Sequence, residues 1–301
     1  MKGFANRERY DETFQLNMRP QVTEDASEYV NKIRALLAEM KEVSIAVSGG
    51  IDSVTLAMLA SQTPNISVQM YHAVSPAVPP QATERVKGLS RDNAWKLQIL
   101  NAHEFADEDY LSNPVNRCFY CKTNLYKAIS AVTGSVILSG ANTDDLTDYR
   151  PGLDAAQNAS VRHPYVETRT NKSMVRAIAK QLGLGKLSEL AASPCLSSRV
   201  ETGIRIDPEL LPLINEIERL ITQSIFPEPK TVRCRIRSAG AVVELDDRSM
   251  ADLTMKEQQV LKKRINTIFE RRGYQYSISF EAYKLGSAFI HIQPMYALDS
   301  R

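Results

Sequence analysis

Residues 43–53 read VSIAVSGGIDS, and this stretch decides the fold. Its first five residues are mostly apolar and β-branched, which is typical of a short buried strand. Two glycines then interrupt the strand, and residues 53–61 have the composition of a helix. A strand, a glycine turn and a helix in this order place the turn at the carboxyl edge of a parallel sheet, where ligands bind in open α/β folds.

The glycine turn, Ser48 to Ser53, has the composition of an anion site. Its glycines allow a sharp turn and a close approach to a ligand, so that successive N–H groups point into one anion-sized hollow. The helix N-terminus adds partial positive charge, and the serine hydroxyls can donate hydrogen bonds. The turn is not a Walker A sequence, because the lysine that reaches the terminal phosphates is missing. The alternative is a simple tight turn in which Asp52 or Ser53 caps the helix.

The flanking sequence alternates between strand and helix patterns. Further strands are expected at residues 66–73, 97–100 and 136–138, and helices at residues 25–40, 81–96, 116–132 and 172–182. Strands that alternate with helices predict an α/β fold, with a parallel sheet covered by helices on both faces.

After about residue 203 the pattern becomes that of an α+β module. Helices are expected at residues 208–223 and 256–272, and strands at residues 231–237, 241–245, 275–280 and 288–293. We therefore predict an irregular arm over residues 1–24, a parallel-sheet nucleotide domain over residues 25–203, and a smaller α+β domain over residues 204–301 for substrate binding or oligomerisation.

Composition narrows the class of protein. The 301 residues include 37 Lys+Arg and 35 Asp+Glu, for a formal net charge of +2, so no strong long-range attraction for nucleic acid or anionic membrane is expected. Residues 1–20 lack the apolar core of a signal peptide, and prolines interrupt the uncharged stretch 53–83. We therefore predict a cytoplasmic protein with no membrane span, in which a Cys-x-x-Cys indicates metal or redox chemistry.

Three of the four cysteines are candidates for a shared site. Cys118 and Cys121 form a Cys-x-x-Cys at the start of a predicted helix, where both sulfurs can point at one metal. Cys195 lies in a predicted loop, SPCLSSR, and Cys234 alternates with apolar residues on a predicted strand, as a buried core thiol does. The candidates leave open a 4Fe–4S cluster, a structural zinc site with a fourth ligand, or three unrelated thiols.

The SGGxDS turn after an apolar strand resembles the PP-loop of the N-type ATP pyrophosphatase superfamily. The resemblance implies a protein that binds ATP, adenylates an oxygen of its substrate and releases pyrophosphate. The residues that would hold the ATP phosphates are Ser48, Gly49, Gly50, Asp52 and Ser53.

A second stretch, GANTDDLTDYRPGL at residues 140–153, restricts the resemblance to one family of this superfamily. Its aspartates, Asp144, Asp145 and Asp148, can hold Mg²⁺, pair with Arg150 or be solvated. Together with the glycine turn, RCFYCK and SPCLSSR, it resembles the LarE family over about residues 35–285. That resemblance implies a sulfur transferase of nickel-pincer cofactor biosynthesis, which adenylates a carboxylate of pyridinium-3,5-biscarboxylic acid mononucleotide and then delivers sulfur to it.

The resemblance also assigns roles to single residues. One branch of the family sacrifices a loop cysteine as sulfur donor, and the other binds a 4Fe–4S cluster that carries an extra sulfide. With three cysteines the chain is similar to the cluster branch, which implies iron ligation by Cys118, Cys121 and Cys195 and a partner that is sulfide or another sulfur donor. The resemblance implies catalytic roles for Cys195, Arg199 and Asp52, and contacts with substrate phosphate for Arg233 and Arg235. The sequence itself adds Lys122, which stands next to Cys121, as a catalytic charge stabiliser or else an exposed helix lysine. Asp148 and Arg150 of the acidic loop are added as cofactor-binding candidates.

The same residues also allow other functions. The family continues SSR with a PYG segment, whereas this chain has Val200-Glu201-Thr202-Gly203, so a paralogue acting on another acceptor is one alternative. Arg233, Arg235 and Arg237, which alternate along the strand expected at residues 231–237, can also form a plain solvated face. A tRNA thiolase of the same superfamily and a non-catalytic nucleotide-binding protein are the others. A homo-oligomer is implied by the resemblance alone.

Overall fold

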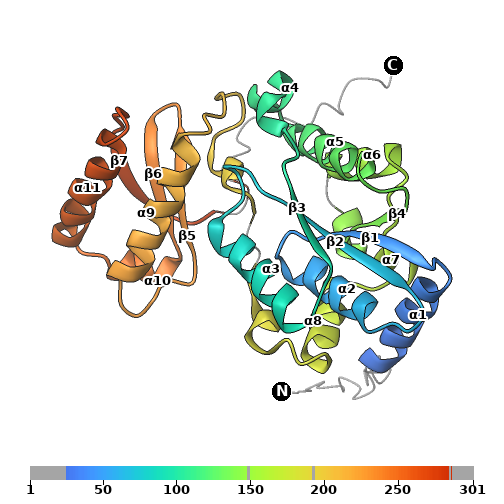
Figure 1. Cartoon of the computed structure of the whole chain (residues 1–301). Helices are drawn as coiled ribbons and strands as arrows, with labels where there is room; N and C mark the ends of the chain where they lie inside the picture. The colour runs from blue at the N-terminus through green and yellow to red at the C-terminus, as the bar shows by residue number, and fades with distance from the viewer. Residues whose placement is uncertain (1–24, 148–149, 192–193, 285, 287–301) are drawn as a thin grey trace, which may run out of the picture.

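The structure is a computed structural model that describes residues 25–147, 150–191, 194–284 and 286. The expected arm at residues 1–24, the expected strand at 288–293 and Asp148 lie outside the described residues. Figure 1 shows two bodies, one around a larger sheet that carries the glycine turn and one around a smaller sheet near the C-terminus. The predicted α/β class, with a smaller α+β module, is confirmed.

The larger sheet has four parallel strands in the order β3-β2-β1-β4. The strands are β1 (Glu42–Ala46), β2 (Ser67–Ala73), β3 (Leu97–Leu100) and β4 (Val136–Leu138). In β1, Ile45 lies opposite Met70 on one side and Leu138 on the other. Since β2 and β3 extend the sheet one way and β4 the other, the strand order reverses between β1 and β4, which is where open α/β sheets bind ligands.

Helices cover both faces of this sheet (Figure 1). The helices are α1 (Ala26–Ala38), α2 (Ile51–Ser61), α3 (Pro80–Asp92), α4 (Glu108–Leu111), α5 (Arg117–Ser130), α6 (Pro151–Asn158), α7 (Pro164–Glu167) and α8 (Lys172–Gln181). Short 3-10 turns occur at η1 (Glu104–Ala106), η2 (Thr143–Leu146), η3 (Gly185–Glu189) and η4 (Leu196–Arg199).

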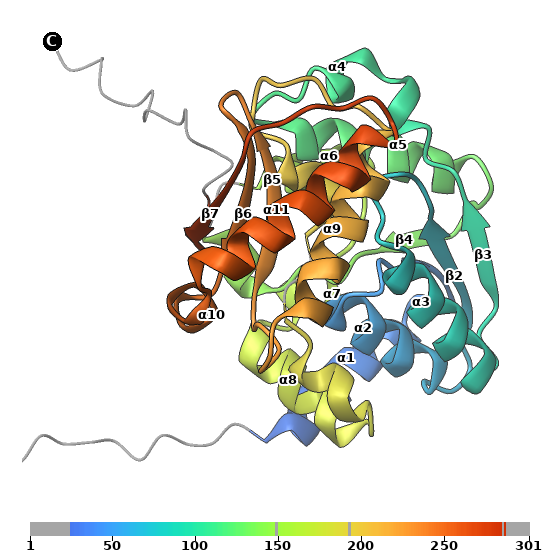
Figure 2. The same ribbon diagram turned by 90° about the vertical axis from the view of Figure 1, so that its left-hand side faces the viewer.

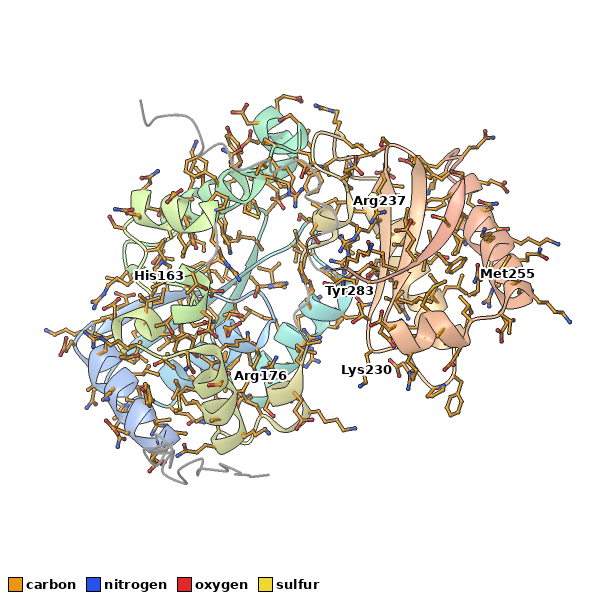
Figure 3. The ribbon with its side chains drawn as sticks, turned by 180° about the vertical axis from the view of Figure 1, so that it is seen from behind. His163, Arg176, Lys230, Arg237, Met255 and Tyr283 are labelled. Carbon is orange, nitrogen blue, oxygen red and sulfur yellow. The ribbon has the colours of Figure 1, made fainter. Side chains whose placement is uncertain are left out.

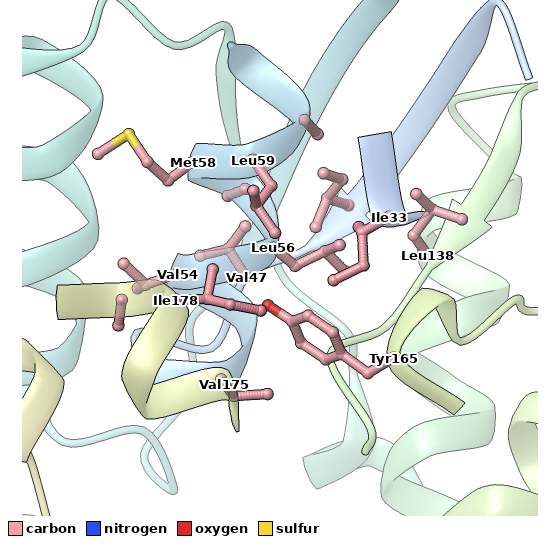
Figure 4. Close-up of a cluster of buried hydrophobic side chains, with 14 of the residues drawn as sticks. Ile33, Val47, Val54, Leu56, Met58, Leu59, Leu138, Tyr165, Val175 and Ile178 are labelled. Carbon is pink, nitrogen blue, oxygen red and sulfur yellow. The ribbon is translucent and has the colours of Figure 1, made fainter. Parts of the chain in front are cut away.

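The main core lies between the sheet and helices α1, α2 and α8, which pack against one another. Figure 4 shows how Ile33, Leu56 and Ile178 from these helices meet Val47 at the end of β1 and Tyr165 from α7. On the opposite face, α5 and α6 cover β4 and β2 with a smaller cluster. Burying one large apolar side chain stabilises the fold by about 1.5–3 kcal/mol. This burial fixes α2 on the sheet, and with it the glycine turn that precedes the helix.

The smaller sheet has the order β5-β6-β7, with β5 and β6 antiparallel and β6 and β7 parallel. Its strands are β5 (Val232–Arg237), β6 (Gly240–Leu245) and β7 (Ile278–Ala282), and its helices are α9 (Leu210–Ser224), α10 (Asp247–Asp252) and α11 (Met255–Glu270). Figure 2 shows α9 and α11 side by side on this sheet. Helix α11 begins with a capping box between Thr254 and Glu257.

Two predicted boundaries differ from the structure by three residues or more. The helix expected at 81–96 ends at Asp92, because Ala94 has a φ of +51° and the Trp95 N–H donates to the Ser90 carbonyl instead of continuing the helix. The strand expected at 275–280 begins at Ile278, since a turn after α11 bonds the Tyr274 N–H to the Phe269 carbonyl.

The hydrophobic cluster of the smaller sheet extends into the first body. Tyr110 and Leu111 of α4 and Leu196 of the SPCLSSR loop are buried in it together with α9, α11 and β5. The SPCLSSR loop is therefore packed between the two sheets. The uncharged stretch at 53–83 forms α2, a turn and β2, and none of the described helices has the length and apolar character needed to cross a bilayer.

Candidate active site

The glycine turn is shaped by its own serines. The Ser48 N–H donates to the Ser53 hydroxyl at 3.1 Å, and that hydroxyl donates to the Gly50 carbonyl at 3.0 Å. The Gly50 N–H donates to the Ser48 hydroxyl at 3.3 Å. These bonds hold the turn in one conformation at the N-terminus of α2, which favours binding of an anion without much loss of entropy.

Glycine is required in this turn by close neighbours as well as by backbone angles. Gly49 has a φ of +83°, and a Cβ there would lie 2.9 Å from the carbonyl oxygen of Ala82 on α3. Arg85, one helical turn further along α3, donates to the Gly49 carbonyl at 2.7 Å. Helix α3 therefore fixes the turn from one side. Arg85 was not singled out by the sequence, which carries no signal for a contact across 36 residues.

A lysine reaches the turn from α8. The Lys172 ammonium pairs with the Asp52 carboxylate at 2.5 Å, and Asn142 donates to the other carboxylate oxygen at 3.3 Å. The Tyr165 hydroxyl donates to the Asp52 carbonyl at 3.1 Å. A cation thus stands beside the loop although the Walker lysine is missing, and Asp52 positions it. Lys172 begins a predicted helix and was not predicted as a site residue.

The acidic loop after β4 is held by hydrogen bonds within the protein. Asn142 and Asp145 form a capping box for η2, and Asp145 also pairs with Arg150 at 2.8 Å. Asp144 accepts from the Lys172 backbone N–H at 3.3 Å. Asp145 thus pairs with Arg150, one of the three expected uses, while Asp144 is exposed to solvent. Binding of Mg²⁺ by this loop stays a prediction.

The three candidate thiols are neighbours across two segments. Cys118 lies at the surface near the start of α5, and Cys121 and Cys195 are half-buried. Burial raises the pKa of Cys121 to about 12, with a contribution from Cys195, and desolvation followed by Cys195 raises the pKa of Cys118. No three His, Cys, Asp or Glu side chains of the described ranges form a ready-made metal-binding group. Cys234 is fully buried, as predicted.

The SPCLSSR loop is fixed by two buried arginines. The Arg199 guanidinium, 2% exposed, makes a two-pronged ion pair with Glu218 of α9 and donates to the carbonyls of Pro194 and Cys195 at 2.7 and 3.2 Å. Arg235 pairs with the buried Glu244 at 2.7 Å and donates to the Ser198 carbonyl at 3.0 Å. Both arginines thus hold the loop that carries Cys195.

The Cys-x-x-Cys helix is joined to the same loop. The buried Asn113, just before α5, donates to the carbonyls of Glu201 and Ile204 at 2.8 and 2.9 Å. The Tyr110 hydroxyl bonds to the Ser197 hydroxyl at 2.7 Å. These contacts bridge some 90 residues of sequence and keep the thiols of both segments close.

Lys122 lies over the Tyr126 ring, within electrostatic reach of the three thiols. Its pKa is raised, first by the Tyr126 side chain, whose ring centroid lies 5.9 Å from the ammonium, and also by Cys121, Cys118 and Cys195, while burial opposes the shift. A raised pKa keeps this lysine protonated at neutral pH. Lys122 is therefore a cation near the thiols, and its charge-stabilising role stays a prediction.

A pocket of about 220 Å³ lies between α3, the Cys195 loop, α9 and β5. It is lined by Pro79, Gln81, Ala82, Arg85, Leu196, Arg199, Asn215, Glu218 and Arg233. A larger pocket of about 590 Å³ shares Gln81, Asn215, Glu218 and Arg233 with it and extends to Lys230, which Figure 3 labels. The shared walls make one groove, in the size range of small-molecule sites.

The polar face of the smaller sheet turns toward the first body. Figure 3 shows Arg237 and Tyr283 on that side, whereas Met255 lies at the far end of the molecule. Burial, and then Arg199, lower the pKa of Arg233, which lines both pockets. An arginine keeps its charge even so, and a guanidinium facing a groove suits a phosphate.

Comparison with known proteins supports the resemblance. No family model matches the chain. Over 247 residues, 80% of the chain and 86% of the relative, it is 28% identical to pyridinium-3,5-bisthiocarboxylic acid mononucleotide synthase of Lactiplantibacillus plantarum. This similarity supports a LarE-like family.

Two further relatives have no assigned function. The chain is 29% identical to an uncharacterized protein of Synechocystis over 262 residues, 85% of the chain and 95% of the relative. It is 26% identical to an uncharacterized protein of Methanocaldococcus jannaschii over 231 residues, 74% and 84% of the two chains. Each match spans most of both proteins, so the likeness includes both bodies of the fold.

The structure brings together most of the predicted site residues in two groups. The glycine turn with Asp52 forms the first group, and Cys118, Cys121, Cys195 and Lys122 form the second. Arg233 lines the groove, while Arg199 and Arg235 are engaged in buried ion pairs and Arg150 pairs with Asp145. Their predicted contacts with ligands stay predictions.

The raised thiol pKa has a consequence for reactivity. In metal-free protein, iodoacetamide is expected to alkylate Cys121 about three orders of magnitude more slowly at pH 8 than it alkylates a free cysteine, because the thiolate is the nucleophile and its pKa is raised to about 12. The rate should keep rising tenfold per pH unit above pH 9, where a free thiol levels off. Mass spectrometry of the Cys121 peptide measures it, and a plateau near pH 8.5 would contradict the expected shift.

Proposed function

We propose that this chain is an ATP-dependent sulfur transferase that activates a carboxylate of a pyridinium mononucleotide and replaces one of its oxygens by sulfur, as in nickel-pincer cofactor biosynthesis. The similarity to a pyridinium-3,5-bisthiocarboxylic acid mononucleotide synthase supports this function at the family level. The glycine turn supports the use of ATP, and the three neighbouring thiols support sulfur chemistry.

The observation that carries the proposal is the composition of the smaller pocket. One wall comes from α3, where Ala82 and Arg85 contact Gly49 of the anion-binding turn. A second wall comes from the loop that carries Cys195, and a third from Arg233 on β5. The helix that contacts the glycine turn, the loop that carries Cys195 and an arginine thus border one space. A reaction between ATP, a carboxylate and a sulfur donor requires such groups to lie close together.

In the activation step, ATP enters as its Mg²⁺ complex and its β- and γ-phosphates occupy the turn. Backbone N–H groups, the N-terminus of α2 and Lys172 supply positive charge there. The substrate carboxylate attacks the α-phosphorus, pyrophosphate leaves, and an acyl adenylate forms. The charge that develops on the leaving pyrophosphate is stabilised by groups that are already in place, which lowers the barrier without reorganisation.

The second step delivers sulfur to the activated carbonyl and releases AMP. The donor set of Cys118, Cys121 and Cys195 suits a 4Fe–4S cluster by its chemistry, because three thiols come from two segments that hydrogen bonds join, and Lys122 is a cation near them. When bound there, such a cluster supplies one iron with an open position for an additional sulfide. As a cation near the thiols, Lys122 would stabilise negative charge on the incoming sulfur or on the carbonyl oxygen of the adenylate.

Arg233 is the residue proposed to bind the phosphate of the substrate nucleotide. Replacing it, as Arg233→Gln, is expected to raise the KM for the nucleotide about 10- to 100-fold, because a charge-assisted hydrogen bond contributes about 1.5–3 kcal/mol. Steady-state pyrophosphate release measures the effect. Arg272→Gln is the control, since Arg272 is an exposed arginine paired with Glu209 outside the groove. Equal KM values in the two variants would contradict the assignment.

A pyrophosphate-release assay with candidate acceptors tests the function as a whole. Release that depends on the pyridinium dicarboxylate nucleotide supports the proposal. ATP binding without release would favour a non-catalytic nucleotide-binding protein. Release with total tRNA, together with retarded migration of the tRNA in a gel, would favour a tRNA thiolase.

A further inference from the structure

Glu104 is a buried residue with one carboxylate oxygen for which the described residues supply no partner. The residue is 4% exposed, and its Oε2 atom has no hydrogen-bond partner among the described residues. Buried polar groups are almost always paired, and leaving one unpaired costs about 1–3 kcal/mol, with more for a charged group. A cost that the fold retains in this way often marks a site that binds something.

The carboxyl group is held firmly in its position. Glu104 begins η1, which follows β3 at the carboxyl edge of the larger sheet and packs against α4 and α5. The Phe105 ring lies edge to face with Tyr110 at 5.3 Å, and Asn124 of α5 donates to Asp107 at 2.5 Å. These contacts fix the turn against the helix that carries Cys118 and Cys121.

Glu104 lies near the segments that carry the thiols. Its neighbour Phe105 packs in the same hydrophobic cluster as Cys121 and Cys195. The negative charge of Glu104 contributes to the raised pKa of Cys121 and of Tyr110, so the carboxyl group is within electrostatic reach of both. Tyr110 in turn bonds to Ser197, two residues after Cys195. Glu104 therefore borders the same space as the cysteines of both segments.

The cations of this region are engaged elsewhere. Arg117 donates to Asn113, and Arg150 pairs with Asp145. Lys122 lies over the Tyr126 ring, and Glu104 is not among the groups that shift its pKa. None of these three cations pairs with Glu104 in the part of the chain that the structure describes, so a cation that binds from outside the protein is a candidate partner.

We propose that Glu104 supplies a fourth, oxygen ligand to the metal centre held by Cys118, Cys121 and Cys195. This inference rests on the metal-binding part of the proposed function. A carboxylate oxygen is a harder and weaker partner for a thiolate-bound iron than sulfide is. Glu104 would close the open position at rest and leave it when sulfide enters, a ligand exchange in which no electron is transferred.

Cobalt(II), added anaerobically to the metal-free full chain, tests this with an optical readout that does not depend on activity. The wild type is expected to bind one Co²⁺ in a tetrahedral site, with thiolate charge-transfer and d–d bands that Cys118→Ser, Cys121→Ser and Cys195→Ser each weaken. E104Q is expected to lower the Co²⁺ affinity at least about tenfold and to change the d–d bands. E108Q, a change to an exposed glutamate on α4, is the matched control and should match the wild type.

The midpoint of thermal unfolding, measured on the metal-free protein, distinguishes a metal ligand from a residue that only stabilises the fold. E104Q removes a buried unpaired charge, so its midpoint should equal or exceed that of the wild type. E104D is a second variant that keeps the charge on a shorter side chain, and it should also bind Co²⁺ more weakly. If E104Q and the wild type have the same Co²⁺ bands and the same Co²⁺ affinity, Glu104 is not a ligand, and the metal site of the proposed function is unaffected. Absence of cysteine-dependent Co²⁺ binding in the wild type would overturn the metal site of the proposed function and the inference with it.

Discussion

Gly140→Ala is expected to abolish measurable ATP binding and to destabilise the protein by about 1–3 kcal/mol, the usual cost of forcing extra atoms into a packed site. A Cβ on Gly140 would lie 2.8 Å from the Ser53 nitrogen and 2.9 Å from the Asp52 carbonyl carbon. These are backbone atoms of the first turn of α2, so relief requires a shift of the helix start. That shift would move the glycine turn, whose N–H groups must stay in one arrangement to bind phosphate.

Isothermal titration with ATP and equilibrium unfolding in urea measure the two effects. Gly134→Ala is the matched control, because a Cβ there meets no atom within 4 Å. It should bind ATP as the wild type does and should unfold at a similar urea concentration. ATP binding by the Gly140→Ala variant within about threefold of the control would show that the turn is not the phosphate site.

Glu218→Ala is expected to cost about 3–5 kcal/mol of folding stability, because it leaves the Arg199 guanidinium buried and without its carboxylate. The side chains of Arg199 and Glu218 are 3% and 13% exposed. The same carboxylate accepts from the Cys234 backbone N–H at 3.0 Å, so the edge of β5 loses a contact as well. Since Arg199 holds the carbonyls of Pro194 and Cys195, Cys195 should also become more accessible to alkylation.

The control for this change lies on the same helix. Glu216 pairs with Arg271 at the surface, where both side chains are about half exposed, so Glu216→Ala is expected to cost less than about 1 kcal/mol. Urea unfolding of both variants measures the difference. Equal losses of unfolding free energy in the two variants would mean that the Arg199–Glu218 pair contributes no more to stability than a surface ion pair.

The fold was predictable from local patterns wherever a strand or helix has a clear apolar period. The run before the glycine turn and the helix after it lie within two residues of their predicted positions. The short helices α4, α6, α7 and α10 were not predicted, because they depend on caps and tertiary contacts and not on a repeated apolar face. The end of α3 was placed too late because its last turn has no strong stop signal in the sequence.

The candidate site was predictable where residues that act together are also close in sequence. Both the glycine turn and the Cys-x-x-Cys have this property. Lys172 pairs with Asp52 across 120 residues, and Glu218 reaches Arg199 from another body of the fold, so neither pairing leaves a local pattern. Arg199 and Arg235 were expected to face ligands, and the structure uses them to hold the Cys195 loop.

The central claim, that this chain activates a carboxylate with ATP and inserts sulfur into it, is tested most directly by mass spectrometry of an anaerobic reaction. The reaction contains iron- and sulfide-reconstituted protein, ATP, Mg²⁺, sulfide and pyridinium-3,5-biscarboxylic acid mononucleotide. We expect pyrophosphate, AMP and a nucleotide in which one carboxyl oxygen has been replaced by sulfur, and no such product from Cys195→Ala. An unchanged nucleotide, with ATP bound but not cleaved, would contradict the claim.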